Sequence, residues 1–160
     1  MPLADALDPS TDIFWRHVGT AILCGAAVGL ERQIRGKVAG MRTSILITLG
    51  TSHFVSLGSA MVPEEVDPTR VLGQVVTGIG FLGAGVILAR GDRIVGVTTA
   101  AVIWVLASIG ALIGAGHLQA AMVATLLTLL VLVGVEGVEK LLLTKKLARG
   151  SGVYGAIDTE

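Results

Sequence analysis

Five apolar stretches of about 20 residues alternate with short polar connections along the chain. A transmembrane helix needs about 20 consecutive, mostly apolar residues to cross the hydrocarbon core of a bilayer. The pattern predicts five spans, at residues 13–30, 43–62, 71–89, 97–115 and 117–138. We expect Asp12 or Thr11 to cap the first helix. The last helix is expected to continue as a basic cytoplasmic tail to residue 149, and residues 150–160 to form a flexible end.

Composition agrees with a membrane protein. Hydrophobic residues make up 52% of the sequence and charged residues 15%, with a mean hydropathy of +0.80, whereas a soluble domain carries about 25% charged residues. Short connections at residues 63–69, 91–96 and 114–116 favour antiparallel neighbours in one bundle. We therefore expect an all-α, polytopic transmembrane helix bundle that forms a single domain over residues 1–149.

Basic residues predict the orientation of the bundle, because cytoplasmic connections are enriched in lysine and arginine. Five spans divide these residues very unequally between the two sides, since only Arg16 and Arg70 fall on one side. We therefore predict an N-terminus outside the cell and a cytoplasmic C-terminus. The ten basic residues on the predicted cytoplasmic side are Arg32, Arg35, Lys37, Arg42, Arg90, Arg93, Lys140, Lys145, Lys146 and Arg149.

The densest block of charge, Leu30–Arg42, connects the first two predicted spans. Glu31 and Arg35 are spaced i, i+4 with the acid first, which is the favourable order for a helical ion pair. That pair, with attraction of the basic residues to lipid headgroups, explains the block without any substrate. Glu31 and Asp92 could in principle hold a hydrated divalent ion, since magnesium uses only one or two carboxylates. The surrounding basic residues argue against this, and we predict no metal site.

Glycine spacing predicts close helix crossings. Residues 78–83 fit the dinucleotide-binding pattern G-x-G-x-x-G, but they lie inside an apolar span without the strand and acidic residue that such a site needs. We interpret them as a packing face, within one chain or between protomers. A local break in the span, as in transporter half-helices, is the alternative. The glycines assigned to helix packing are Gly25, Gly29, Gly78, Gly80, Gly83, Gly85, Gly110 and Gly114.

Polar residues inside the spans are the usual functional candidates in membrane proteins. Gln74 and Thr77 share one face of the third span, and His53 lies near the middle of the second. Interhelical hydrogen bonding explains such residues, and a pH-sensing or proton-relay role is the alternative for His53. The sequence shows neither a nucleophile with its base nor a cluster with metal-ligand spacing. We therefore expect neither an enzyme nor a cofactor.

Three ordered stretches resemble the MgtC/SapB family of bacterial inner-membrane proteins. They are Gly29–Thr43 (GLERQIRGKVAGMRT), Gln74–Ile87 (QVVTGIGFLGAGVI) and Gly96–Ala101 (GVTTAA), with Trp104 following. Val95 departs from the pattern, because the family often has arginine there. The better-known members also carry a soluble cytoplasmic domain after the last span, where this sequence has only a short tail.

The resemblance implies a multi-pass inner-membrane protein linked to growth under magnesium limitation and, in pathogens, to survival inside host cells. It also implies self-association into a homo-oligomer and control of a membrane partner such as the F-type ATP synthase. The polar residues that match the family motifs are Glu31, Arg32, Gln33, Arg35, Lys37, Arg42, Thr43, Gln74 and Thr99.

The sequence leaves two functions open. The first is a non-catalytic regulator that lies in the lipid bilayer and acts through helix-face contacts with a membrane partner. No nucleic-acid partner is expected. The second is a small oligomeric transporter or channel for divalent cations such as magnesium, with Gln74, Thr77, Glu31 and Asp92 along its route. The lack of a carboxylate in the third span favours the regulator.

Overall fold

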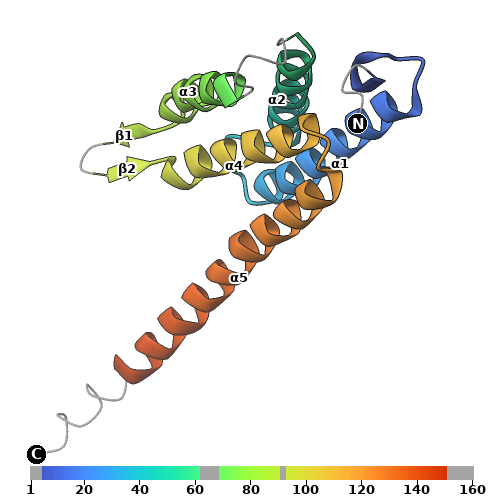
Figure 1. Cartoon of the computed structure of the whole chain (residues 1–160). Helices are drawn as coiled ribbons and strands as arrows, with labels where there is room; N and C mark the ends of the chain where they lie inside the picture. Colours follow the sequence, from blue (N-terminus) through green and yellow to red (C-terminus); the bar gives the residue numbers. More distant parts are fainter. Residues whose placement is uncertain (1–4, 62–68, 91–92, 151–160) are drawn as a thin grey trace, which may run out of the picture. The chain divides into compact units, whose positions relative to one another are not determined.

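The computed structural model describes residues 5–61, 69–90 and 93–150, and side chains only as far as residue 135 in the last helix. Five α-helices account for most of this part of the chain (Figure 1). The elements in order are the 3-10 turn η1 (Asp5–Leu7), α1 (Asp12–Ile34), α2 (Met41–Met61), α3 (Thr69–Gly85), β1 (Leu88–Arg90), β2 (Arg93–Val95), α4 (Val97–Gly114) and α5 (Leu118–Gly150).

The prediction of five helices is confirmed, and four of them are long and apolar enough to span a membrane. These are α1, α2, α4 and the segment Leu118–Val135 of α5. Helix α3 is shorter, at 17 residues. The number of spans and their orientation therefore stay predictions. The predicted continuation of the last helix is confirmed, because α5 runs to Gly150.

The prediction of a helix over residues 71–89 is wrong at its C-terminal end. Helix α3 ends at Gly85, and Leu88–Arg90 forms the strand β1, which pairs antiparallel with β2. Glycine is a poor helix former, and the α3 sequence ends in three glycines within six residues, Gly80 to Gly85. Gly96 then starts α4 with a φ of 95°, and a Cβ there would lie 2.0 Å from the Val86 carbonyl oxygen. Because Gly96 lies this close to Val86, the chain between them folds back on itself and β1 pairs with β2.

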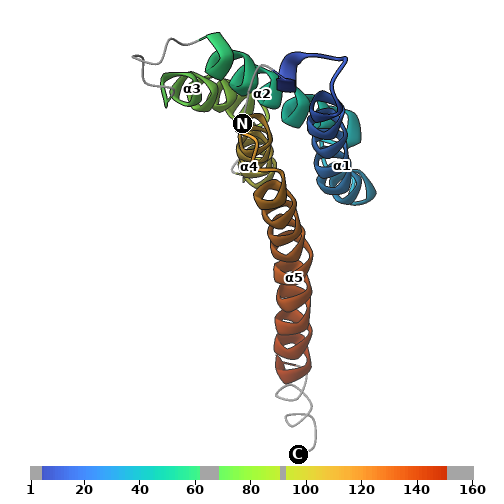
Figure 2. The same cartoon turned by 45° about the vertical axis from the view of Figure 1, so that its right-hand side comes forward.

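Helix contacts divide the chain into two compact units, Met1–Leu126 and Leu127–Glu160. The second unit contains the rest of α5, a single continuous helix as far as Gly150. The first unit contains α1 to α4 and the start of α5. Helix α2 packs on α1, α3 and α4 and has the most extensive helix contacts of the unit (Figure 2). One cluster of its buried apolar side chains comprises Ala21, Cys24, Ile109, Ile113 and Ala121.

Helices α1 and α2 touch through their backbones. A Cβ on Gly25 would lie 2.7 Å from Cα of Ile45, and a Cβ on Gly29 would lie 2.6 Å from Cα of Met41. The Thr48 hydroxyl donates a hydrogen bond of 2.8 Å to the carbonyl of Ala21, on the facing helix. Only glycine at positions 25 and 29 permits this approach.

Helices α2 and α4 repeat the arrangement. A Cβ on Gly110 would lie 2.6 Å from the Thr48 carbonyl oxygen, and a Cβ on Gly114 would lie 2.5 Å from the Ser52 carbonyl oxygen. The Ser56 hydroxyl donates a 3.1 Å hydrogen bond to the Gly114 carbonyl. One polar stripe of α2 thus serves two neighbours, and small residues at the crossings bring the backbones together.

Helix ends follow familiar capping rules. Thr11 caps α1, as predicted, by accepting a hydrogen bond from the Phe14 amide. Gly36 closes the other end with a φ of 64°, while the Lys37 amide donates to the Arg32 carbonyl at 2.9 Å. This pairing defines a Schellman motif, in which glycine takes the left-handed conformation. The turn between α4 and α5 uses Gly116 in the same way, with a φ of 85°.

We expect Gly110→Val to lower the free energy of unfolding by roughly 3 kcal/mol, the upper end of the range for overpacked core positions. The added side chain would meet the Thr48 carbonyl oxygen, which belongs to the backbone and cannot rotate away. Equilibrium unfolding in mixed detergent micelles, followed by tryptophan fluorescence, measures the effect. Gly19→Ala is the control, because nothing lies within 4 Å of that Cβ. Equal stability of Gly110→Val and the native chain would contradict the close contact.

Thr48→Val tests the hydrogen bond between α1 and α2. We expect a loss of about 0.6 to 1.7 kcal/mol, the range for interhelical hydrogen bonds in membranes. Thr20→Val is the matched control, since the Thr20 hydroxyl donates only to Arg16 within its own helix. The same unfolding assay applies. A loss of stability in Thr20→Val as large as that in Thr48→Val would contradict a stabilising hydrogen bond between α1 and α2.

Candidate functional site

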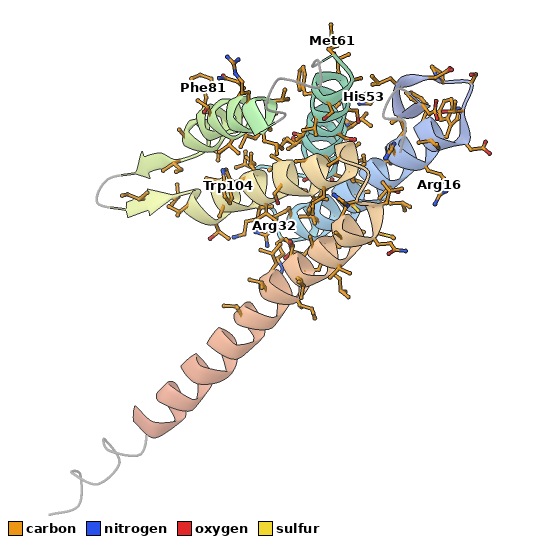
Figure 3. The ribbon with its side chains drawn as sticks, in the orientation of Figure 1. Arg16, Arg32, His53, Met61, Phe81 and Trp104 are labelled. Atoms are coloured by element: carbon orange, nitrogen blue, oxygen red, sulfur yellow. The ribbon has the colours of Figure 1, made fainter. Side chains whose placement is uncertain are left out.

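The end of α1 holds a buried ion network, which we name the charged junction: Glu31, Arg32 and Arg35. Arg32 is only 3% exposed (Figure 3), and its Nε and Nη2 both donate to the Glu31 carboxylate, the latter to Oε1 at 2.7 Å. Nε of Arg35 lies 2.5 Å from the same Oε1, which confirms the predicted i, i+4 pair. Two guanidinium groups therefore share one carboxylate, and the junction carries a net positive charge.

The connection after the junction is fixed by the side chain of Gln33. Its Oε1 accepts a 3.3 Å hydrogen bond from the Met41 amide, at the start of α2. An amide at a helix start has no acceptor inside the helix, so Gln33 supplies one from the preceding helix. The side chains of Lys37 and Arg42 are exposed on either side of this contact. The motif residues thus combine a rigid turn with basic groups free to meet headgroups or a partner.

The structure offers no support for a cation at Glu31. Guanidinium groups bind both of its carboxylate oxygens. Asp92, the other candidate ligand, lies outside the described residues. Within the part of the chain that the structure describes, no group of three or more His, Cys, Asp or Glu side chains could hold a metal ion.

A groove of about 720 Å³ runs between α2 and α3, and we name it the α2–α3 groove. Leu46 and Phe54 of α2 face Val75, Ile79 and other apolar side chains of α3 across it. Seven of the lining residues belong to the stretches that resemble the family: Thr43 at the start of α2, and Gln74, Val75, Gly78, Ile79, Leu82 and Val86 on the α3 side. Thr99, in contrast, is buried near the start of α4.

The α3 glycines differ from those of α1 and α4. A Cβ at Gly78, Gly80 or Gly85 would meet nothing within 4 Å, and one at Gly83 would make an ordinary 3.7 Å contact with Ala100 of α4. Among the residues that the structure describes, no close crossing of the kind made by Gly25 or Gly110 forms at these positions. A packing role for Gly78, Gly80 and Gly85 stays a prediction, and the helix that packs against them would belong to another molecule.

His53 is half-buried on α2. Its Nδ1 lies 2.8 Å from the Leu49 carbonyl oxygen, one turn earlier in the same helix, and its ring meets the Phe14 ring edge-on at 6.2 Å between centroids. The hydrogen bond stays within α2, so it is not the interhelical bond that the sequence favoured, and only the ring contact with Phe14 reaches another helix. The proton-relay alternative stays untested.

Thr43 and Gln74 are separate motif residues in the sequence, which does not show that they line one groove. Nor does it identify Leu46, Phe54 and Ile103, which complete the groove wall. The reason is physical: in a membrane helix nearly every position is apolar, so composition does not distinguish a groove wall from a lipid-facing side chain. Only the arrangement of α2, α3 and α4 does.

Glu31→Gln should lower the free energy of unfolding by about 3–5 kcal/mol, because removing one partner of a buried ion pair leaves the other charge without compensation. Lys37→Gln, at an exposed position, should stay within about 0.5 kcal/mol of the native chain. Denaturation in mixed micelles with and without magnesium measures both. If magnesium stabilised the native chain but not Glu31→Gln, Glu31 would be a cation ligand and the structural account would be wrong.

This chain is similar in sequence to several known proteins. Residues 18–141 match the model of the MgtC family. The putative magnesium transporter YhiD of Escherichia coli K12 is 47% identical over 124 residues, which cover 73% of this chain and 57% of that protein. Protein MgtC of Brucella abortus is 47% identical over 105 residues (66% and 44%), and protein MgtC of Salmonella typhimurium is 44% identical over 109 residues (68% and 46%).

The chain thus spans about half the length of these curated relatives. No solved structure matches it. None of the three names describes an enzyme, and the apolar helices indicate a membrane protein. The match to the family model, together with relatives at 44–47% identity, shows that this chain belongs to the MgtC family.

Proposed function

We propose that this chain is a non-catalytic regulator of the bacterial inner membrane, which binds an apolar helix of a membrane-protein partner in the α2–α3 groove under magnesium limitation. The observation that carries the proposal is the position of the motif residues Thr43, Gln74 and Gly78. They line an open groove instead of packing inside the chain. A motif that served only the chain's own stability would be buried, as Thr99 is.

The dimensions and chemistry of the groove suit a helix. Its wall on the α3 side extends from Val71 to Val86, the residue that follows α3, and its wall on α2 extends from Thr43 to Phe54. At 1.5 Å per residue these walls are about 22 Å and 16 Å long, or three to four helical turns. The apolar lining suits a bilayer-embedded helix, and Gln74 and the hydroxyls of Thr43 and Thr51 offer hydrogen bonds to polar groups on it. The F-type ATP synthase is the partner implied by the family resemblance.

Transport is the competing function, and the name of one relative, putative magnesium transporter YhiD, favours it. Against it stands the charged junction, where Glu31 is held by Arg32 and Arg35. A cation route past this point would meet net positive charge. A transporter would also need an assembly of several copies to enclose a pore.

Gly78→Leu is the direct test, because it fills the groove while its Cβ meets nothing in the chain. In a strain that lacks its own copy, we expect Gly78→Leu to fold and insert but to restore less than a tenth of the growth advantage in low-magnesium medium. Gly73→Leu is the matched control: the position lies on the same helix, has open space around it and does not line the groove.

Magnesium flux into proteoliposomes that hold the purified native protein completes the test. We expect flux no greater than in protein-free liposomes. Saturable flux that Gly78→Leu leaves intact would establish a transporter in place of the regulator. Equal growth with Gly78→Leu and Gly73→Leu would show that the groove does not serve the function.

A further inference from the structure

A second pocket has a more polar lining than the α2–α3 groove. It has a volume of about 490 Å³ and lies between the first turns of α1 and the turn that joins α4 to α5. Its lining includes Arg16 and His17 of α1, His117 of the turn, and Leu118 to Ala120, the first residues of α5. Neither sequence reasoning nor the family motifs assigned it a role, and it does not depend on the proposed function.

His17 is the unusual residue of this pocket. It is only 4% exposed, yet neither Nδ1 nor Nε2 has a hydrogen-bond partner in the described structure. Buried polar atoms in folded proteins are nearly always paired, and an exception asks for an explanation such as a bound ion. His17 is also one of the residues that line the pocket.

The start of α5 adds hydrogen-bond donors to the same pocket. The Ala121 amide donates to the His117 carbonyl at 3.0 Å, which begins the helix. The amides of Leu118, Gln119 and Ala120 precede that bond and have no acceptor within the helix. The first turn of α5 carries no acidic residue, so the positive end of the helix dipole is uncompensated there.

Arg16 makes the pocket cationic. Its side chain is exposed near the start of α1 (Figure 3), and the described residues that line the pocket include no carboxylate. A guanidinium group and free helix amides repel a metal cation and attract an anion. Two histidines alone also fall short of the three protein ligands that zinc sites use.

We propose that this pocket binds a phosphate group, held by the guanidinium of Arg16, the imidazoles of His17 and His117, and the free amides at the start of α5. Arginine pairs with phosphate oxygens through two parallel N–H donors. The helix amides bind a further oxygen, and His17 gains the partner that it lacks. The phosphate can belong to inorganic phosphate or to a phospholipid headgroup, since the pocket adjoins the ends of two candidate membrane spans.

Histidine ring resonances provide the assay, because the chain has only three histidines. Protein labelled with ¹⁵N-histidine in a neutral maltoside detergent is titrated with inorganic phosphate. We expect the His17 and His117 rings to shift and saturate, while His53, whose Nδ1 already meets the Leu49 carbonyl, stays unchanged. Arg16→Gln should raise the apparent Kd at least about tenfold, the effect of losing one charge-assisted contact.

Arg70→Gln is the matched control, because Arg70 is also exposed at a helix start but does not line the pocket. It should leave the Kd within twofold, whereas His117→Gln, a second exposed position, should weaken binding. Nanodiscs distinguish the two sources. Shifts with phosphatidylglycerol and none on adding phosphate assign a lipid headgroup, and shifts on adding phosphate assign the free anion. The proposal is overturned if neither source shifts His17, or if Arg16→Gln and Arg70→Gln behave alike.

Discussion

The backbone contact of α2 with two neighbouring helices is the constraint on which the first unit depends. In a bilayer, lipid tails are as apolar as leucine, so no hydrophobic force drives helices together. Close approach and interhelical hydrogen bonds must supply the stability. Gly25 and Gly29 on one side of α2, and Gly110 and Gly114 on the other, allow that approach. The Thr48 and Ser56 hydroxyls then reach carbonyl groups of α1 and α4.

This arrangement determines which helix faces remain available to bind a partner. Because the polar stripe of α2 is used by α1 and α4, its opposite side, with exposed Leu46 and Phe54, faces the α2–α3 groove. Among the described residues, the glycines of α3 make no close backbone crossing like that of α4, and Gly78 leaves room for a neighbour, although Gly58 of α2 does lie against the Val71 side chain of α3. The Gly36 turn and the hydrogen bond from the Met41 amide to Gln33 fix the connection from α1 into α2, and therefore the position of Thr43 at the groove's end. Stability and the candidate binding surface thus come from different faces of the same helix.

The sequence predicted the features that depend on local chemistry. The apolar stretches located five helices, Thr11 was a correct cap, and the Glu31–Arg35 spacing identified a real ion pair. Features that depend on the arrangement of helices were missed. Spacing alone made Gly78 and Gly110 look alike, yet one faces open space and the other the Thr48 carbonyl. The hairpin after Gly85 was also missed, because an apolar run reads equally well as a helix or a strand. His17 carried no signal at all, since its burial without a partner is visible only in three dimensions.

We propose that the α2–α3 groove binds a helix of another membrane protein. Photo-cross-linking in living cells tests it most directly, with the photoreactive residue placed at Leu82, inside the groove, or at its neighbour Phe81, which is 81% exposed and outside it (Figure 3). Under magnesium limitation, the account predicts a discrete adduct with one membrane protein from position 82 and none from position 81. Equal labelling from both positions, or lipid adducts alone from position 82, would contradict the account.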